Sequence, residues 1–316
     1  MKSILIFRTD RIGDFLISSI LISSIKRKYP NVEIDIVCSD FNFNYVKSFN
    51  FFKNVFLYPK TFLKKIYFFF SLKTYDYIFT LDGKKRSIYY TIFNLSQKKI
   101  LFTPSKKIKF FFNIFFDHTF LINYNYPKID LIKNCLHKIN CNYSKLDLNF
   151  LLNFNNIKNY KSPFKNDYII LNFDEKWIFN KYIKTYKNIE PNIDELIIFI
   201  SDLSKNQNLI LTNGFIENPV LEKLKEKNIL QNQKNFIIKD KIDIFELQFL
   251  IKNSSCLITC HGAPSHIGSN YNVNIIDIVD NSEIKFFQSY NFHFNNKVQI
   301  IRDDFKILSK KIISLI

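Results

Sequence analysis

Glycine, proline and tryptophan are scarce in this chain, with five, eight and one of them among 316 residues. No GxGxxG pattern occurs, which excludes the dinucleotide-binding fingerprint that such glycines form. No run approaches the roughly 18 apolar residues of a membrane-spanning helix. The apolar run at residues 3–7 is too short for a signal peptide. We therefore expect the protein to stay in the cytoplasm.

Cysteines are few and scattered. Their number is odd and none of them forms a CxxC pair, which argues against a disulfide framework or a zinc site. Small buried thiols are the expected state of such residues. The chain also lacks internal repeats, apart from two loosely similar α/β halves. The cysteines are Cys38, Cys135, Cys141, Cys256 and Cys260.

Acidic residues are few in the first half of the chain. Residues 1–150 contain 24 Lys and Arg against 10 Asp and Glu, a net charge of +14, out of +17 for the whole chain. A compositional bias of the genome would not load one half in this way. We infer that this half meets an anionic partner, which is a phospholipid surface, an acidic glycolipid or nucleic acid.

The first 37 residues read as a βαβ unit. Residues 3–7 and 32–37 are apolar, β-favouring runs, and apolar residues between Phe15 and Tyr29 follow helical spacing. Such a unit implies a parallel sheet, whose ligands lie beyond the C-terminal strand ends, where the polar turn at residues 8–14 falls. Asp14 stands near the first helical turn, where the helix dipole favours a carboxylate. A helix-capping acid is the alternative.

Two stretches, residues 60–72 and 106–116, combine lysines with dense runs of phenylalanine. Both resemble interfacial segments, in which basic side chains meet anionic headgroups and aromatic rings reach the acyl boundary. The alternative is a domain core with a solvated basic rim. A nucleic-acid partner is not expected, because proteins that bind nucleic acids present isolated aromatic residues spaced along a basic groove, whereas these stretches are continuous runs.

A second α/β pattern follows a polar, Asn-rich stretch. Residues 168–173 read as a strand, and the turn after it contains Lys176, which could meet a phosphate, and Trp177, which could close one side of a pocket. A surface turn with a half-buried tryptophan is the alternative. Glu217 follows the strand at residues 208–212, where a carboxylate could accept hydrogen bonds from ribose hydroxyls. A solvated loop glutamate is the other interpretation.

The stretch from Ser254 to Asp277 predicts a strand, a turn of small residues, a helix start and a second buried strand. Backbone N–H groups beside the positive end of a helix form an anion site. His261, Ser265 and His266 add side-chain donors to this turn. The hypothesis is that the turn holds the diphosphate of a nucleotide donor, and an ordinary βα turn is the alternative.

Two motifs at opposite ends of the chain resemble glycosyltransferase family 9, the ADP-heptose:lipopolysaccharide heptosyltransferase family. That family opens with a strand, a turn ending in Gly-Asp, a helix and a Tyr-Pro, and Gly13-Asp14 and Tyr29-Pro30 stand at those places. Its C-terminal motif, Asp-(Ser/Thr)-Gly-Pro-x-His after a buried strand, is similar to residues 261–266. Pro264 and His266 match it.

The resemblance implies a GT-B fold, an α/β architecture of two Rossmann-like domains with parallel sheets facing a central cleft. It implies inverting transfer of a sugar, heptose or a related one, from a nucleotide-sugar, without a metal ion or other cofactor. Asp14 would be the general base, with Arg11 and Gly13 on the acceptor side. Lys176, His266 and the backbone of Gly262 and Ala263 would hold the donor, with His261 and Ser265 also on that side.

The sequence departs from the family motif where His261 replaces the Asp and where Ala263 replaces the Gly. The family's Asp helps bind the heptose donor, so a histidine implies a different sugar or nucleotide. A non-catalytic nucleotide-sugar or glycolipid-binding protein with a degenerate site is therefore the second hypothesis, and a nucleic-acid-binding protein the third.

The domains expected from these patterns are an acceptor-binding, membrane-facing domain and a nucleotide-sugar-binding domain. They span residues 1–155 and 167–300, with a linker at 156–166 and a closing amphipathic helix at 301–316. The expected partners are the nucleotide-sugar, an anionic lipid-linked saccharide such as lipopolysaccharide core, and the inner face of the cytoplasmic membrane. We expect a monomer.

Overall fold

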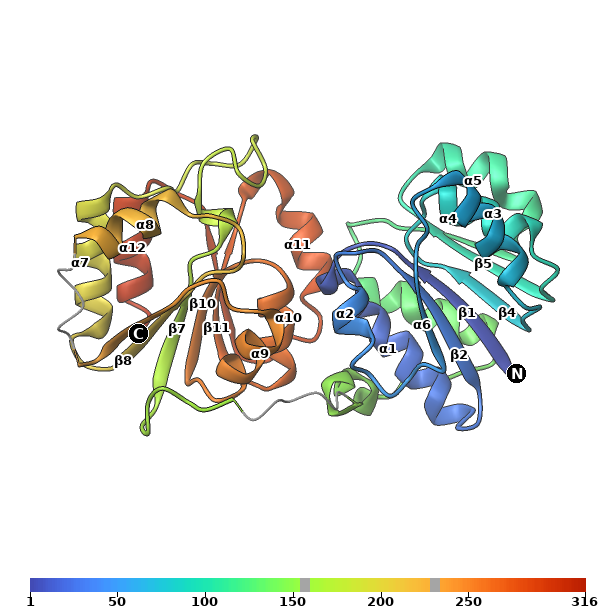
Figure 1. Ribbon diagram of the computed structural model, residues 1–316, viewed down its shortest axis with the longest axis horizontal. Coiled ribbons are helices and arrows are strands. Elements are labelled where there is room, and N and C mark those ends of the chain that lie inside the picture. The colour runs from blue at the N-terminus through green and yellow to red at the C-terminus, as the bar shows by residue number, and fades with distance from the viewer. Residues whose placement is uncertain (154–159, 228–233) are drawn as a thin grey trace. The chain divides into compact units, whose positions relative to one another are not determined.

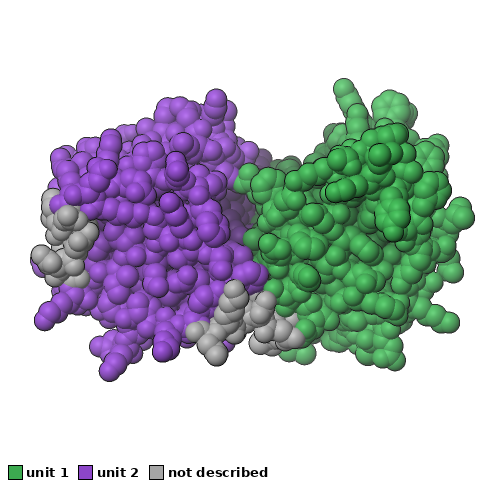
Figure 2. All heavy atoms as spheres, in the orientation of Figure 1, with its two compact units in different colours: residues 1–156, 288–292 green, residues 157–287, 293–316 purple. Residues whose placement is uncertain are grey.

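The computed structural model spans residues 1–316 and describes all of them except 154–159 and 228–233. The chain forms two compact units (Figure 2). Unit 1 contains Met1–Asn156 and Gln288–Phe292, and unit 2 contains Ile157–Phe287 and His293–Ile316. The predicted linker lies partly outside the described residues, at 156–159. Within the described ranges, no helix has the length and apolar character needed to cross a membrane.

Unit 1 is built on a six-stranded sheet in the order β3-β2-β1-β4-β5-β6, and all neighbouring strands are parallel. The parallel βαβ unit predicted for the start of the chain is confirmed. The interior of β1 is fully buried, as expected for a central strand covered on both faces. The strands are β1 (Ser3–Arg8), β2 (Glu33–Cys38), β3 (Asn54–Leu57), β4 (Tyr77–Thr80), β5 (Lys98–Thr103) and β6 (His118–Leu121).

Helices cover both faces of this sheet. α3, α4 and α5 lie on one face, while α1 and α6 pack together on the other (Figure 1). The helices are α1 (Ile12–Lys28), α2 (Phe43–Val46), α3 (Phe62–Ser71), α4 (Lys85–Phe93), α5 (Lys106–Phe112) and α6 (Lys128–Lys138). Short 3-10 turns are η1 (Asn113–Phe115), η2 (Lys145–Leu148) and η3 (Phe150–Asn153).

Helix α1 begins at Ile12, three residues earlier than the apolar spacing predicted. Its N-cap, Arg11, makes no side-chain capping hydrogen bond, so the usual signal of a helix start is missing from the sequence. The earlier start places Asp14 inside the first turn rather than before it.

Unit 2 is built on a second parallel sheet, in the order β12-β11-β10-β7-β8-β9. When the strands of each unit are counted from its own first strand, the two sheets have the same order. Each therefore has a point where the order reverses, between β1 and β4 in unit 1 and between β7 and β10 in unit 2. The strands are β7 (Tyr168–Asn172), β8 (Asn208–Thr212), β9 (Phe236–Lys239), β10 (Cys256–Cys260), β11 (Asn274–Val279) and β12 (Lys297–Ile301).

The helices of unit 2 also cover both faces of their sheet, with α7, α8 and α12 packed together and α9 against α10 (Figure 1). They are α7 (Ile193–Ser204), α8 (Pro219–Glu226), α9 (Ile244–Lys252), α10 (Ala263–Asn270), α11 (Ile284–Tyr290) and α12 (Phe305–Ile313), with 3-10 turns η4 (Glu175–Trp177) and η5 (Asn281–Glu283). The predicted closing helix is α12, and it packs its apolar side into the core.

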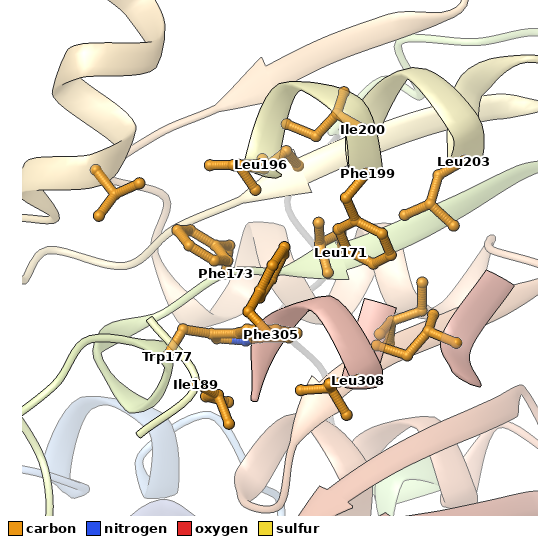
Figure 3. Close-up of a cluster of buried hydrophobic side chains, with 14 of the residues drawn as sticks. Leu171, Phe173, Trp177, Ile189, Leu196, Phe199, Ile200, Leu203, Phe305 and Leu308 are labelled. Carbon is orange, nitrogen blue, oxygen red and sulfur yellow. The ribbon is translucent and has the colours of Figure 1, made fainter. Parts of the chain in front are cut away.

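Trp177 lies in that core and does not border a pocket, so the prediction for this residue was wrong. Its side chain is fully buried among Phe173, Phe199 and Phe305 (Figure 3). The indole Nε1 donates a hydrogen bond to the carbonyl oxygen of Asn172 at 2.8 Å. The polar handle of the ring is thus satisfied inside, and nothing holds the ring at the surface.

Candidate functional site

The points of strand reversal are where open parallel sheets bind ligands, at the carboxyl ends of the two strands that flank them. In unit 1 these ends lead into the turns after Arg8 and Thr80, and in unit 2 into those after Asn172 and Cys260. The predicted residues Asp14, Lys176 and the 261–266 turn all follow such strands directly. Each unit therefore has one candidate half-site, described separately below.

The half-site of unit 1 is organised by a buried arginine. Arg8 is 5% exposed, and its guanidinium pairs with the carboxylates of Asp10 at 3.2 Å and Asp14 at 3.3 Å. Nη1 also donates a hydrogen bond to the carbonyl oxygen of Leu81 at 2.5 Å. Burial opposes the charge, but Asp14 and Asp10 outweigh it and raise the pKa of Arg8. The guanidinium is therefore a fixed cation that positions both acids.

Asp14 is held by its backbone as well as by its side chain. Its carbonyl oxygen accepts hydrogen bonds from Arg8 Nη2 and from Ser18 Oγ, both at 3.0 Å. Its side chain remains 34% exposed, so the carboxylate is oriented and still open to a ligand. The neighbouring acceptor-side predictions lie in the same segment, with Arg11 exposed at the N-cap and Gly13 partly exposed in the first turn.

A second polar layer joins the turn after β1 to the turn after β4. Asp82 accepts hydrogen bonds from Thr9 Oγ1 at 2.6 Å and Ser87 Oγ at 2.7 Å. Burial and the nearby Asp10 raise the pKa of Asp82. Lys84 Nζ contacts Asp10 and the carbonyl oxygen of Thr9, each at 2.7 Å. Asp82 and Lys84 were not predicted as site residues, although the polar residues directly after the strand ending at Thr80 were a usable signal.

The half-site of unit 2 is organised by a buried lysine. Lys176 is 10% exposed, and its Nζ lies 2.8 Å from Asp174 Oδ2. Nζ also donates a hydrogen bond to the carbonyl oxygen of Cys260 at 3.2 Å, which links the turns after β7 and β10. Burial opposes the charge, but Asp174 and Glu175 outweigh it and raise the pKa of Lys176. The side chain is therefore a permanent, immobilised cation.

Gly262 lies directly against this lysine. A Cβ atom at position 262 would be 2.8 Å from Lys176 Nζ, so any side chain there would displace the ammonium. The N–H of Gly262 donates to Ser265 Oγ at 3.3 Å. Ala263 begins α10, so its N–H lacks an acceptor within the helix. The cation and a helix start thus meet at the end of β10, as an anion site requires.

The polar residues of the 261–266 turn connect to a buried carboxylate that the sequence analysis missed. His261 Nδ1 lies 2.9 Å from Asp277 Oδ2, and Ser265 Oγ donates to Asp277 Oδ1 at 2.8 Å. Burial raises the pKa of Asp277, but His261 and Ser265 outweigh this and lower it. Asp277 therefore orients His261 and leaves Nε2 for a ligand. The signal was an acid inside an otherwise apolar strand.

Ser265 and His266 point into the unit. Ser265 is fully buried, and His266 is 3% exposed, with its Nδ1 at 3.2 Å from His293 Nε2. Burial and the neighbouring His293 and His261 lower the pKa of His266 well below its ordinary value. His266 is thus a neutral imidazole that supports the turn. Among the described residues, no group of three His, Cys, Asp or Glu side chains could hold a metal ion.

A small hollow opens beside Lys176. Arg302 donates from Nη2 to the carbonyl oxygen of Lys176 at 2.7 Å, and its guanidinium lies 5.5 Å from the ring centroid of Tyr186. The hollow offers three cations and two phenol rings, and sequence patterns did not reveal it. Glu217 is not part of it and lies exposed in the loop between β8 and α8. The polar lining comprises Lys176, Asn180, Tyr182, Tyr186, Lys187, Asn188 and Arg302.

Comparisons with known proteins give similarity of fold. No family model matches the chain, and no curated protein matches its sequence. The structure of E. coli heptosyltransferase WaaC with ADP is similar, with a TM-score of 0.71, 12% identity and coverage of 98% of both chains. A glycosyl transferase family 9 protein from Veillonella parvula has a TM-score of 0.66 and 13% identity, covering 98% of this chain and 89% of that one.

Proteins of another activity share the architecture. The UDP-GlcNAc 2-epimerase of Methanocaldococcus jannaschii has a TM-score of 0.59 and 14% identity, over 100% of this chain and 92% of that chain. The expected α/β fold is thus confirmed, with two Rossmann-like units of the GT-B class. At these identities the likeness establishes the fold alone.

Proposed function

We propose that the chain is a glycosyltransferase of the family 9 type, which moves a sugar from a nucleotide-sugar to a hydroxyl of a lipid-linked or lipopolysaccharide-type glycan. The observation that carries the proposal is the position of the motif residues. Asp14 stands at the point of strand reversal in one sheet, and Lys176 with Gly262 stands at the equivalent point in the other. The motifs resemble that family, and the fold is that of its solved members.

Unit 2 would bind the donor. The leaving nucleoside diphosphate gains negative charge as its bond to the sugar breaks, and Lys176 and the start of α10 offer positive charge at one place. Arg302 and Lys187 extend this charge along the hollow. A single preorganised donor of this kind contributes about 3 kcal/mol to transition-state stabilisation.

Unit 1 would activate the acceptor. The acceptor hydroxyl oxygen attacks the anomeric carbon while the bond from that carbon to the diphosphate breaks, and the hydroxyl proton passes to Asp14. Attack opposite the leaving group inverts the anomeric centre, and no metal ion is needed when protein cations hold the diphosphate. Arg8 keeps the carboxylate oriented, and 34% of that side chain is open to the substrate.

His261 points to a donor other than ADP-heptose. With Nδ1 held by Asp277, Nε2 remains for the substrate, which is a different hydrogen-bonding pattern from the carboxylate of the family motif. We propose that this position selects the sugar or its nucleotide.

The acceptor side of the proposal includes contact with an anionic membrane surface. Among the residues of α3, only Phe68 is buried, and α5 buries none. Phe62, Tyr67 and Phe70 of α3 are 74%, 78% and 79% exposed. Phe68 and Phe69 of α3 and Phe112 of α5 pack against hydrophobic clusters of unit 1. The other aromatic side chains of the two helices are exposed, which favours the interfacial interpretation over a domain core with a basic rim.

The two helices belong to one surface of unit 1. α3, α4 and α5 cover the same face of the sheet (Figure 1). Phe69 of α3 contacts Phe93 of α4, and Tyr89 of α4 contacts Phe112 of α5. Exposed lysines accompany the rings, among them Lys64, Lys106 and Lys107. We call α3 and α5 with these side chains the aromatic–basic face. Rings that enter the acyl boundary beside lysines that meet anionic headgroups are typical of peripheral membrane proteins.

The experiment that tests the function is a panel of nucleotide-sugars, first screened for thermal stabilisation and then assayed with lipid-linked acceptors. A ligand at 100 times its dissociation constant adds about 2.7 kcal/mol of stability. We expect one donor to stabilise the protein and to release its nucleoside diphosphate only when an acceptor is present. Binding without turnover would support the non-catalytic alternative, and isomerisation of the sugar without acceptor would support an epimerase.

A further inference from the structure

Lys128 is a buried amine that the proposed mechanism does not use. It is the first residue of α6, is 7% exposed and belongs to unit 1. Its Nζ lies 5.7 Å from the ring centroid of Phe102 and 5.7 Å from that of Tyr290. Within the described part of the chain, this amine makes no hydrogen bond and no ion pair. An ammonium group is therefore buried with aromatic faces as its contacts.

The carboxylates near Lys128 are already engaged. Asp10 and Asp14 both pair with Arg8, and Lys84 adds a second cation at Asp10. Burial and the charge of Arg8 lower the pKa of Lys128 to about 7, against smaller raising effects of Asp14 and Asp10. Cation–π contact offsets only part of the cost of burying an unpaired charge.

The surroundings of the amine favour an anion. α6 is 11 residues long and starts at Lys128. Its N-cap, Pro127, makes no side-chain capping hydrogen bond, so no capping side chain satisfies the N–H groups at the helix end that carries Lys128. The acid in that turn, Asp130, is 53% exposed and lies 4.0 Å from Lys133.

We propose that Lys128 and the start of α6 form a subsite for an anionic group of the acceptor, a phosphate or a carboxylate carried close to the hydroxyl that Asp14 deprotonates. The proposal rests on the proposed function, because it assigns the amine to the acceptor. It makes Lys128 a binding residue, whose ammonium pairs with the acceptor instead of with the protein.

Binding at this subsite takes up a proton. The groups that face the amine are Arg8 of β1, Asp10 after it, Asp14 of α1 and Tyr290 of α11, and none of them supplies a free negative charge. An anion favours the charged amine and raises its pKa. Affinity for the anion therefore falls as pH rises above 7, by as much as tenfold per pH unit.

The test is an NMR titration of the full chain, labelled with 13C at lysine Cε. The lysine resonances are followed with pH in the absence of added anion, with inorganic phosphate, and with acetate. We expect one resonance to titrate near pH 7, to disappear in Lys128→Met and to shift its midpoint upward with phosphate, with acetate or with both. A phosphate effect assigns a phosphate to the acceptor, and an acetate effect a carboxylate. A midpoint unmoved by either anion, or a titration near pH 7 that survives in Lys128→Met, would overturn the proposal.

Variants separate a ligand-binding lysine from a structural one. Lys128→Met should raise the acceptor KM at least tenfold and leave kcat little changed. Its Tm at pH 7.5 should be equal to that of the unaltered protein or higher, because an unpaired buried amine is removed. Lys128→Arg should restore KM and abolish its pH dependence, and Lys133→Met on the same helix should change neither. A Tm loss in Lys128→Met with unchanged KM would contradict the subsite. Phosphate binding is measured without any nucleotide-sugar, so the subsite and the proposed function can fail independently.

Discussion

Units 1 and 2 have sheets of the same strand order, yet the ion pairs at the points where that order reverses differ in which member is open to solvent. In each unit a buried cation follows or ends the first strand and pairs with an acid, Arg8 with Asp14 and Lys176 with Asp174. In unit 1 the acid is the open member, with 34% of its side chain exposed. In unit 2 both members are nearly closed, and the lysine lies against Gly262 and the start of α10. In the proposed function, one architecture thus supplies a base in one unit and an anion site in the other.

The surfaces of the two units differ in the same direction. Residues 1–150 carry most of the net charge, and the aromatic–basic face belongs to unit 1. Unit 2 buries many of its aromatic residues, as in the cluster around Trp177 (Figure 3), and exposes Phe179 and Phe215 singly. The proposed function assigns the anionic surface to unit 1 and the soluble nucleotide-sugar to unit 2, although the two folds are similar.

The largest effect is expected at the base of unit 1. Asp14→Asn should lower turnover about 10³-fold, because an amide cannot accept the acceptor proton, and general bases contribute roughly 10²–10⁴ in rate. Affinity for the nucleoside diphosphate should stay within twofold. Initial rates of diphosphate release and calorimetric titration measure the two quantities. The exposed acid Asp194, in the first turn of α7, provides the matched control, Asp194→Asn, and full activity in Asp14→Asn would remove the assigned base.

The next effect belongs to the cation of unit 2. Lys176→Met should weaken nucleoside diphosphate binding about 10²-fold, since a hydrogen bond from a charged group contributes roughly 1.5–3 kcal/mol. Gly262→Ala should act in the same direction, because its Cβ would displace the ammonium. Calorimetry provides the measurement, with Lys311→Met, at an exposed lysine of α12, as control. Equal binding by Lys176→Met and the unaltered protein would contradict the donor site.

A smaller effect is expected at the aromatic–basic face. Replacing Phe62, Tyr67 and Phe70 by serine should reduce partition onto anionic vesicles at least tenfold, because each exposed ring contributes on the order of 1 kcal/mol or more at an interface. Stability should not change, since these side chains are exposed. Serine at Ile198, an exposed apolar residue of unit 2, is the control. Vesicle co-sedimentation that is unaffected by the triple change would place membrane contact elsewhere.

The smallest effect concerns pH and the stability of unit 2. The pKa of His266 is lowered in the folded protein, so the unfolded chain binds more protons below about pH 6.5. Stability is therefore retained above that pH and falls below it, by up to about 1.4 kcal/mol per pH unit. His266→Gln should flatten the change in Tm between pH 7.5 and 5.5, whereas His118→Gln in unit 1 should not. An unaltered pH profile in His266→Gln would show that burial of this imidazole has no influence.

Local patterns predicted those features of the fold that depend on a few adjacent residues. The boundaries of β8 agree with the strand predicted at residues 208–212, because a short apolar run shows directly which residues are buried. Asp14 and Lys176 could be placed at strand ends for the same reason. The start of α1 was less visible, since no capping side chain marks it.

Features that depend on neighbours distant in sequence were not predictable. Asp82 meets Thr9, and Asp277 meets His261, only because β4 joins β1 and β11 joins β10. Nothing local reveals that residues 288–292 join unit 1, so the ring of Tyr290 over Lys128 could not be foreseen. For Trp177 the sequence predicted a site residue that the structure does not confirm, because its side chain faces the core although it stands next to Lys176.

The assignment of donor binding to unit 2 and acceptor binding to unit 1 is tested most directly by hydrogen exchange. Exchange is measured with and without a nucleoside diphosphate, with ADP, UDP, GDP and CDP tried in turn. The account predicts that the diphosphate that binds slows exchange in unit 2, in peptides covering residues 174–180 and 260–270. Exchange at residues 8–16 of unit 1 should not change. Protection at residues 8–16 without protection in unit 2 would contradict the assignment of donor and acceptor sides.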